Sequence, residues 1–166
     1  MLLQLKDVFL SEGTRQRFDY SLPMSDFEYN GDYPFKSPVE ISAEASNRAG
    51  LVELKIKAVF DYTTRCDRCF EDLTKHMEQI FVHGLAASLI DDENDDYIET
   101  PDYTLELDEV VISDILLNLP SKMLCREDCR GLCPKCGKNL NNGDCGCDTQ
   151  QVDSRLEILK QLIDQE

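Results

Sequence analysis

The sequence predicts an α+β fold: an antiparallel β-sheet meander followed by a helix, a cysteine-rich knuckle and a terminal helix. Three observations predict it. Residues 39–62 alternate between apolar and polar side chains, which is typical of strands with one buried face. Apolar side chains recur at helical spacing in two later segments, 108–119 and 153–163. Six of the eight cysteines fall within 23 residues that lie between those two segments.

A hairpin is the centre of the predicted sheet. Its first strand covers 39–46 and its second covers 52–62, and the polar, glycine-containing segment between them predicts a turn. A third strand is expected over 73–82. The turn that carries Cys66 and Cys69 would therefore connect the second and third strands.

The remaining elements flank this hairpin. Weaker strand patterns occur near the N-terminus, at 2–5 and 18–22. Asp108 is expected to be the N-cap of a helix that Pro120 ends, and Asp153 is expected to be the N-cap of the final helix.

An acidic run separates the sheet from the first of these helices. Residues 91–109 contain ten carboxylates and no basic residue, and their mutual repulsion predicts a solvated loop over 91–102. A docking site for a basic partner is the alternative. We expect one folded unit, with an antiparallel scaffold over 1–120, a cysteine-rich knuckle over 121–152 packed on it, and a C-terminal helix over 153–166.

Length and charge bound the class of protein. A chain of 166 residues has the size of one domain, and its 42% hydrophobic content is enough for a core. Its formal charge of −16 excludes a generic polyanion binder that works through a globally basic surface. No apolar run approaches the ~20 residues needed to span a bilayer, and the N-terminus lacks the pattern of a secretory signal. We therefore expect a cytoplasmic protein with no membrane partner.

Cysteine spacing is the strongest functional signal. In a reducing cytoplasm, clustered thiols are more often metal ligands than disulfides. Eight thiolates match two tetrahedral four-cysteine sites, which predicts two structural zinc ions with no open coordination position. All eight cysteines are therefore candidate metal ligands: Cys66, Cys69, Cys125, Cys129, Cys133, Cys136, Cys145 and Cys147.

Two of the cysteine pairs have CxxC spacing. Cys133 and Cys136 precede Gly137, whose access to left-handed backbone geometry suits a zinc knuckle. Cys66 and Cys69 have the same spacing, and predicted strands on both sides favour a metal-binding turn over a redox pair. Structural thiols without metal are the further alternative for this pair.

If each pair stays intact, the four pairs form two sites in three ways, and the sequence does not choose among them. Loop entropy favours joining the third pair along the chain (133/136) with the fourth (145/147), because the loop between them is short. The first pair (66/69) would then share a metal ion with the second (125/129), and this ion would attach the knuckle to the sheet.

The sequence contains no evident catalytic constellation. His76 and His83 have no nucleophile nearby in the sequence, and we expect both to be ordinary surface or core histidines. No glycine-rich phosphate loop is present. We therefore expect a protein that is not an enzyme and has no small-molecule substrate.

The segments around the cysteine turns are basic, although the whole chain is acidic. Residues 121–140 carry five basic and two acidic side chains, a local charge of +3. These basic side chains are a candidate nucleic-acid contact surface. Equally well, they would compensate the −2 charge of each zinc–thiolate cluster, and no nucleic acid would then be bound. The candidate nucleic-acid-binding residues are Arg65, Arg68, Lys122, Arg126, Arg130, Lys135 and Lys138.

Four motifs occur in a fixed order along the chain. They are Cys66-Asp67-Arg68-Cys69, Leu117-Asn118-Leu119-Pro120, Gly131-Leu132-Cys133-Pro134-Lys135-Cys136-Gly137-Lys138-Asn139-Leu140-Asn141 and Cys145-Gly146-Cys147. Together they resemble the bacterial YceD-like family, whose members are called large ribosomal RNA subunit accumulation proteins. The third motif is the specific one, and the resemblance covers nearly the whole chain.

The resemblance implies a cytosolic, non-enzymatic factor needed for normal synthesis, processing or stability of 23S ribosomal RNA. It favours ribosome biogenesis, with ribosomal RNA or a pre-50S particle as the partner. An acidic chaperone or adaptor for a basic ribosomal protein, acting through the run at 91–109, is the second hypothesis. A zinc protein switched by oxidation of its thiols is the third.

Overall fold

The computed structural model describes residues 1–88 and 97–148. The chain divides into two compact units. The first unit contains Met1–Thr64 and Leu73–Ser121, and the second contains Arg65–Asp72 together with the chain from Lys122 onward. The predicted helix over 153–166 lies outside the described residues, as does the part of the acidic run before Tyr97.

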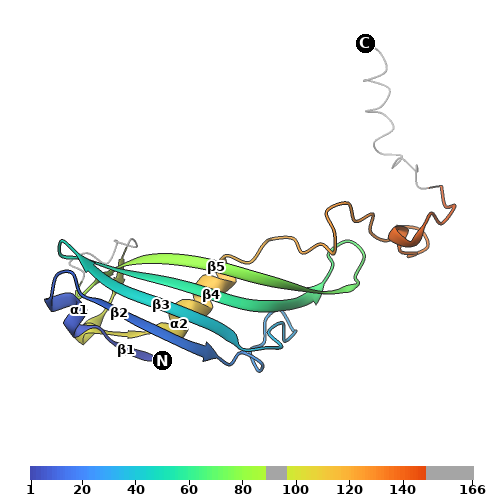
Figure 1. Ribbon diagram of the computed structural model, residues 1–166. Helices are drawn as coiled ribbons and strands as arrows, with labels where there is room; N and C mark the ends of the chain where they lie inside the picture. The colour runs from blue at the N-terminus through green and yellow to red at the C-terminus, as the bar shows by residue number, and fades with distance from the viewer. Residues whose placement is uncertain (89–96, 149–166) are drawn as a thin grey trace, which may run out of the picture. The chain divides into compact units, whose positions relative to one another are not determined.

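A five-stranded sheet dominates the first unit, in the order β2-β3-β4-β5-β6 (Figure 1). The strands are β2 (Arg15–Leu22), β3 (Val39–Arg48), β4 (Leu51–Arg65), β5 (Asp72–Ala86) and β6 (Tyr97–Glu99). The predicted hairpin is confirmed, because β3 and β4 pair antiparallel from the Arg48–Leu51 pair onward. The predicted third strand is confirmed as β5.

The turn of the hairpin is tighter than the polar pattern indicated. Ala49 and Gly50 alone connect β3 to β4, and both have positive φ, of 52° and 82°. Positive φ at both central residues is the geometry of a two-residue hairpin turn whose twist matches that of the strands. Asn47 supports the turn by accepting a hydrogen bond from the backbone N–H of Gly50 at 3.1 Å.

The sheet is mixed: β2, β3 and β4 pair antiparallel, as the predicted meander requires, but the prediction did not include a parallel strand. The short strand β6 pairs parallel with the end of β5, with Gly84 opposite Tyr97. Gly84 leaves the space for this pairing, since a Cβ there would lie 2.6 Å from the Tyr97 ring. Thr100, which is fully buried, fixes the crossing by donating its hydroxyl to the Ala86 carbonyl at 2.9 Å.

Within the predicted acidic loop over 91–102, Tyr97–Glu99 form the strand β6 and Thr100 is buried, whereas Pro101 and Asp102 are exposed. The count of carboxylates gave too little weight to the apolar side chains and the buried Thr100 inside the run. Beyond this strand the chain continues through a 3₁₀ turn, Pro101–Tyr103, into a second sheet. That sheet pairs β1 (Leu2–Gln4) antiparallel with β7 (Thr104–Glu106).

Two α-helices complete the first unit. The short α1 (Lys6–Leu10) was not predicted, because five residues are too few for helical periodicity to show. The predicted second helix is α2 (Leu107–Leu117), which ends before Pro120 as expected. Its N-cap position is Glu106, so the prediction of Asp108 as the N-cap was wrong. The Asp108 carboxylate instead accepts a hydrogen bond from the Tyr20 hydroxyl at 2.6 Å.

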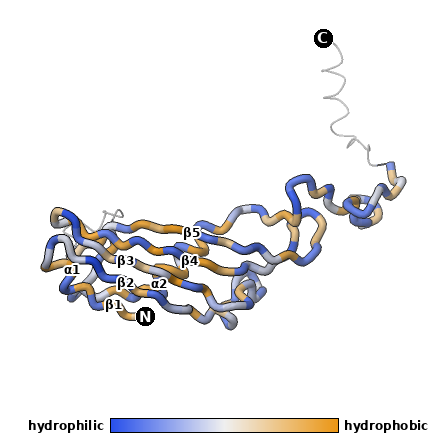
Figure 2. The backbone as a smooth tube through the Cα atoms, viewed as in Figure 1, coloured by the Kyte–Doolittle hydropathy of each residue, from blue (hydrophilic) through white to orange (hydrophobic). Residues whose placement is uncertain are grey.

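The core lies between one face of the five-stranded sheet and α2, which is behind the sheet in Figure 1. Hydropathy alternates along the long strands, as Figure 2 shows. The even-numbered side chains of β4 from Val52 to Tyr62 are buried, and Val111 and Ile115 of α2 are buried with them. Among the described residues, no helix is both long enough and apolar enough to cross a membrane.

Both histidine rings lie within hydrogen-bond distance of a carboxylate in the first unit. His83 on β5 contacts Asp114 of α2 at 2.7 Å, and His76 contacts Asp61 at 2.9 Å on the outer face of the sheet. These contacts connect neighbouring elements, which suits the ordinary structural role expected for both rings.

Candidate metal centre

The eight cysteines form two groups of four in the second unit. The first cysteine group contains Cys66, Cys69, Cys125 and Cys129, and the second cysteine group contains Cys133, Cys136, Cys145 and Cys147. Within each group, all Sγ atoms lie within 4.8 Å of one another, so each group can hold a metal ion. The grouping is the one that loop entropy favoured.

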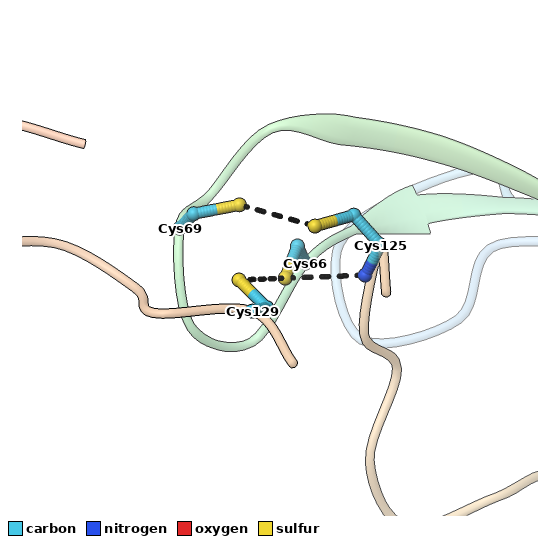
Figure 3. Close-up of side chains that lie close together, drawn as sticks. All are labelled: Cys66, Cys69, Cys125 and Cys129. Atoms are coloured by element: carbon cyan, nitrogen blue, oxygen red, sulfur yellow. Dashed lines mark hydrogen bonds between the residues drawn. The ribbon is translucent and has the colours of Figure 1, made fainter. Parts of the chain in front are cut away.

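The first cysteine group has the dimensions of a tetrahedral thiolate site (Figure 3). The Sγ atoms of Cys66 and Cys129 are 3.7 Å apart, and those of Cys69 and Cys125 are 3.6 Å apart. Sulfur atoms at about 2.3 Å from a central ion define a tetrahedron with edges of about 3.8 Å. A disulfide would instead bring two sulfurs to about 2.05 Å, and all eight cysteines are free thiols.

The two CxxC turns have the same backbone geometry. In the first knuckle (Cys66–Glu71), the N–H of Cys66 donates to the Glu71 carbonyl and the N–H of Phe70 donates to the Cys66 carbonyl, both at 2.9 Å. The second knuckle (Cys133–Lys138) repeats both bonds at the same positions and the same distance. Each turn therefore aims two thiols at one point.

Backbone pairing joins the first knuckle to the segment that supplies the other two thiols of its group. Asp67 and Met123 exchange two hydrogen bonds, one through the Asp67 N–H at 2.9 Å and one through its carboxylate at 2.6 Å. The Arg68 carbonyl accepts from the Leu132 N–H at 3.1 Å. Gly131 permits this approach, because a Cβ there would lie 2.9 Å from the Arg68 carbonyl oxygen.

Asn141 connects the first cysteine group to the chain between the third and fourth cysteine pairs. Its side-chain N–H donates to the Cys129 Sγ at 3.3 Å. Its side-chain oxygen accepts from the Arg130 backbone N–H and from the Arg126 guanidinium, both at 2.8 Å. Sequence reasoning missed this role, since the only signal at Asn141 was its place at the end of the motif that contains the second knuckle.

The thiol pKa values in the first cysteine group reflect burial, N–H donors and the neighbouring thiols. Burial raises the pKa of Cys66, but backbone N–H groups, chiefly that of Cys125, outweigh burial and lower the pKa to about 6. The Asn141 amide lowers the pKa of Cys129. Burial and the neighbouring thiols raise the pKa of Cys125 to about 12. The amides thus favour some thiolates, and a bound cation would relieve the repulsion that opposes the rest.

The second cysteine group lies nearer to solvent than the first. Cys133 is buried, Cys136 is exposed, and Cys145 and Cys147 are half-buried. Backbone N–H groups, first that of Cys136, lower the pKa of Cys133 to about 6. The neighbouring Cys136 is the largest cause that raises the pKa of Cys147 to about 12. Both groups therefore combine thiols whose pKa is lowered by backbone N–H donors with thiols whose pKa is raised by burial and by neighbouring thiols.

The predicted basic residues all lie in the second unit and are exposed, yet most of them have partners there. Three arginines form ion pairs: Arg65 with Asp72, Arg126 with Asp128 and Arg130 with Asp144.

The other four predicted basic residues differ in whether their side chains form hydrogen bonds. Arg68 donates to the Cys129 carbonyl at 2.9 Å, and Lys138 donates to the Asp144 carbonyl at 2.9 Å. Among the described residues, no ion pair or hydrogen bond involves the ammonium groups of Lys122 and Lys135.

The charge of the second unit is balanced rather than basic. Its described residues, 65–72 and 122–148, contain seven basic and seven acidic side chains. With neutral thiols this part of the chain has no net charge, and each thiolate cluster around a dication would add −2. The +3 charge of residues 121–140 alone is therefore offset by carboxylates that the fold brings beside it.

A mixed β-sheet unit combined with a unit that holds two four-cysteine groups defines a β-scaffold protein with candidate metal centres. The model of the family described as large ribosomal RNA subunit accumulation protein YceD matches residues 54–163. The chain belongs to this family. No solved structure matches the chain.

Related sequences come from bacteria and from a plant. A protein of Mycobacterium leprae is 31% identical over 81 residues, 46% of this chain and 37% of the relative. A protein of Mycobacterium tuberculosis is 30% identical over 102 residues, 59% of this chain and 49% of the relative. A chloroplastic protein of Arabidopsis thaliana, called large ribosomal RNA subunit accumulation protein YCED homolog 1, is 26% identical over 164 residues, 81% of this chain and 51% of the relative. The chain spans about half the length of these relatives or less.

Proposed function

We propose that this chain is a non-enzymatic factor that acts in the cytoplasm in biogenesis of the large ribosomal subunit. Its role would be to support synthesis, processing or stability of 23S ribosomal RNA. Membership of the family supports the process, and the two four-cysteine groups support a structural role for the cysteines. Four thiols around one point leave no open position at which a substrate could bind a metal ion, which is typical of structural rather than catalytic sites.

We propose that each cysteine group holds one structural zinc ion. Four soft thiolate ligands in tetrahedral arrangement favour zinc over the hard cations, which take oxygen ligands. The sulfur separations in the first cysteine group fit zinc–thiolate geometry. The ions would hold the first knuckle against the segment from Cys125 to Cys129 and would close the second knuckle on Cys145 and Cys147.

We propose that the second unit also contacts ribosomal RNA, through the basic side chains that form no ion pair or hydrogen bond among its described residues. Lys122 and Lys135 carry this proposal, because their ammonium groups are exposed and the other predicted bases are engaged within the unit. A Lys122→Glu/Lys135→Glu double variant should bind a large-subunit RNA fragment more weakly than wild type. The slope of log K against log salt should become shallower by about 0.9 for each lost phosphate contact.

The matched control for this experiment lies in the first unit. Lys6 and Lys36 are exposed, so a Lys6→Glu/Lys36→Glu variant has the same change in net charge. Equal weakening by the two double variants would mean that global charge, and not a local contact, governs RNA binding. RNA binding that is identical in all three proteins would overturn the proposed RNA contact.

A second candidate function, an adaptor for a basic ribosomal protein, is favoured by the charge balance of the second unit and by the overall charge of −16. Five carboxylates of the acidic run precede β6: Asp91, Asp92, Glu93, Asp95 and Asp96. Replacing them with the matching amides leaves β6, β7 and α2 unaltered in sequence. If purified basic large-subunit proteins bind this variant as tightly as they bind wild type, the acidic run is not their docking site.

A further inference from the structure

The two knuckles share the same two backbone hydrogen bonds, but they differ in the residue that follows the second cysteine. In both, the residue after the second cysteine donates its N–H to the carbonyl of the first cysteine and adopts positive φ. That residue is Gly137 in the second knuckle, with φ of 72°, and Phe70 in the first knuckle, with φ of 59°. Glycine reaches this region without steric cost, whereas a bulky L-residue there is a genuine outlier.

The Phe70 side chain gains little inside the molecule in return for this strain. Its exposed fraction is 65%, among the highest of the large apolar residues described. Among the described residues, none of the ring–ring contacts involves it. A strained backbone and an exposed ring at the same residue point to a contact made outside the chain.

The neighbours of Phe70 indicate what kind of contact fits. Two arginines with exposed side chains lie at this turn: Arg65 comes just before it and pairs with Asp72 at 3.5 Å, and Arg68 lies within it and donates to the Cys129 carbonyl at 2.9 Å. The adjacent carboxylates are directed to internal donors: Asp67 accepts from the Met123 N–H at 2.6 Å, and Glu71 accepts from the Asn139 amide at 2.8 Å. Flat aromatic rings and guanidinium planes are the groups on which unpaired RNA bases stack.

We propose that Phe70 is a base-stacking residue, and that the first knuckle binds an unpaired base of single-stranded RNA against the Phe70 ring, flanked by Arg65 and Arg68. This inference rests on the proposed RNA contact and specifies its chemistry. The described residues of the second unit have no net charge, so the contribution of Phe70 is stacking and not attraction to phosphates. Stacking on an uncharged ring forms no ion pair with RNA, so loss of the Phe70 ring should leave the salt dependence of RNA binding unchanged.

The chain contains no tryptophan, which gives a direct assay. In a Phe70→Trp variant, the only indole lies at the knuckle, and a base that stacks on it quenches its fluorescence. The probe is an unstructured oligoadenylate of about ten nucleotides, compared with an RNA duplex of the same length whose bases are already paired. We expect quenching by the single strand and none by the duplex. Tyr33→Trp, at a residue of the first unit that is 45% exposed, is the matched control and should not be quenched.

A second variant measures the contribution to affinity. Phe70→Gly gives the first knuckle the residue that the second knuckle has at this position, so the turn and its metal content should be retained. We expect this variant to bind the oligoadenylate between about 5-fold and 150-fold more weakly than wild type, the range for loss of one stacked base. The salt dependence of binding should be unchanged.

Three results would overturn the inference. Unchanged affinity of Phe70→Gly in a chain that binds RNA excludes stacking on Phe70 while leaving the proposed RNA contact intact. Absence of RNA binding by wild type itself removes both. A change in Phe70→Trp fluorescence on adding a basic large-subunit protein, with none on adding RNA, would identify the ring as a protein contact.

Discussion

Substitution of Asn141 by alanine is expected to weaken metal binding by one cysteine group and not by the other. The amide makes three hydrogen bonds: it donates to the Cys129 Sγ at 3.3 Å and accepts from Arg130 and Arg126 at 2.8 Å each. Alanine removes all three without filling their place. The thiolate of Cys129 loses its amide donor, and the Arg130 N–H loses its acceptor.

The expected magnitude follows from the type of contact that is lost. Substitution of groups that hydrogen-bond to metal ligands typically costs 10-fold to 100-fold in metal affinity, which corresponds to roughly 1.4 to 2.8 kcal/mol. The N–H···S bond and the Arg130 bond, at about 1 kcal/mol net each, give a sum of similar size. Only the first cysteine group contains Cys129, so the second group should retain its affinity.

Competition with a chromophoric chelator measures the two affinities separately in the full chain. Wild type should retain two tightly bound ions, and Asn141→Ala should yield one of them to the chelator at a lower chelator concentration. Asn142→Ala is the matched control, because Asn142 is the exposed neighbour and only its backbone N–H is bonded, to the Asn139 carbonyl. If Asn141→Ala behaves like Asn142→Ala, or if both ions weaken equally, Asn141 does not position the first group.

Three further outcomes are expected. Gly131→Ala should lower the free energy of unfolding of the second unit by more than about 1–2 kcal/mol. A Cβ there would lie 2.9 Å from the Arg68 carbonyl oxygen, and this clash adds to the cost of positive φ. Gly137→Ala has the positive φ without such a contact, so it should cost less in the same denaturant titration. Ile115→Ala should destabilise the first unit by about 2–5 kcal/mol, since Ile115 is fully buried, and metal content measured below the unfolding transition should not change. Acidification should release metal with uptake of protons, because protons compete for the thiolates; metal retained at a pH where all thiols are protonated would contradict thiolate ligation.

Alternation and cysteine spacing along the sequence predicted the long strands and the cysteine groups. The pairing of β6 and the role of Asn141 were not predicted, because both depend on contacts between residues that are distant in the sequence. The alternation along β3 and β4 is set by one buried face, so it is visible in the sequence. The parallel pairing of β6 depends on a glycine 13 residues earlier in the chain, at Gly84, and no pattern within the acidic run shows it. The role of Asn141 depends on where Cys129 lies in space, and spacing along the chain does not encode that.

The charge of the candidate RNA surface also depends on contacts between residues that are distant in the sequence. Residues 121–140 are basic by themselves, but the carboxylate of Asp144 pairs with Arg130 at 2.6 Å, and Asp72 at the start of β5 pairs with Arg65 at 3.5 Å. These partners lie outside that segment, so its composition could not reveal them. Lys122 and Lys135 differ from the other basic residues in forming no ion pair or hydrogen bond within residues 1–88 and 97–148, and their positions in the sequence do not show this difference.

The metal content of the purified full chain tests the structural role of the cysteines most directly. Two zinc ions per chain are predicted, one for each group of four thiols. Cys129→Ser and Cys133→Ser should each reduce the content to one, because each removes a ligand from a different group. A wild-type chain that binds no metal, or one in which either single substitution removes both ions, would contradict two separate structural zinc sites.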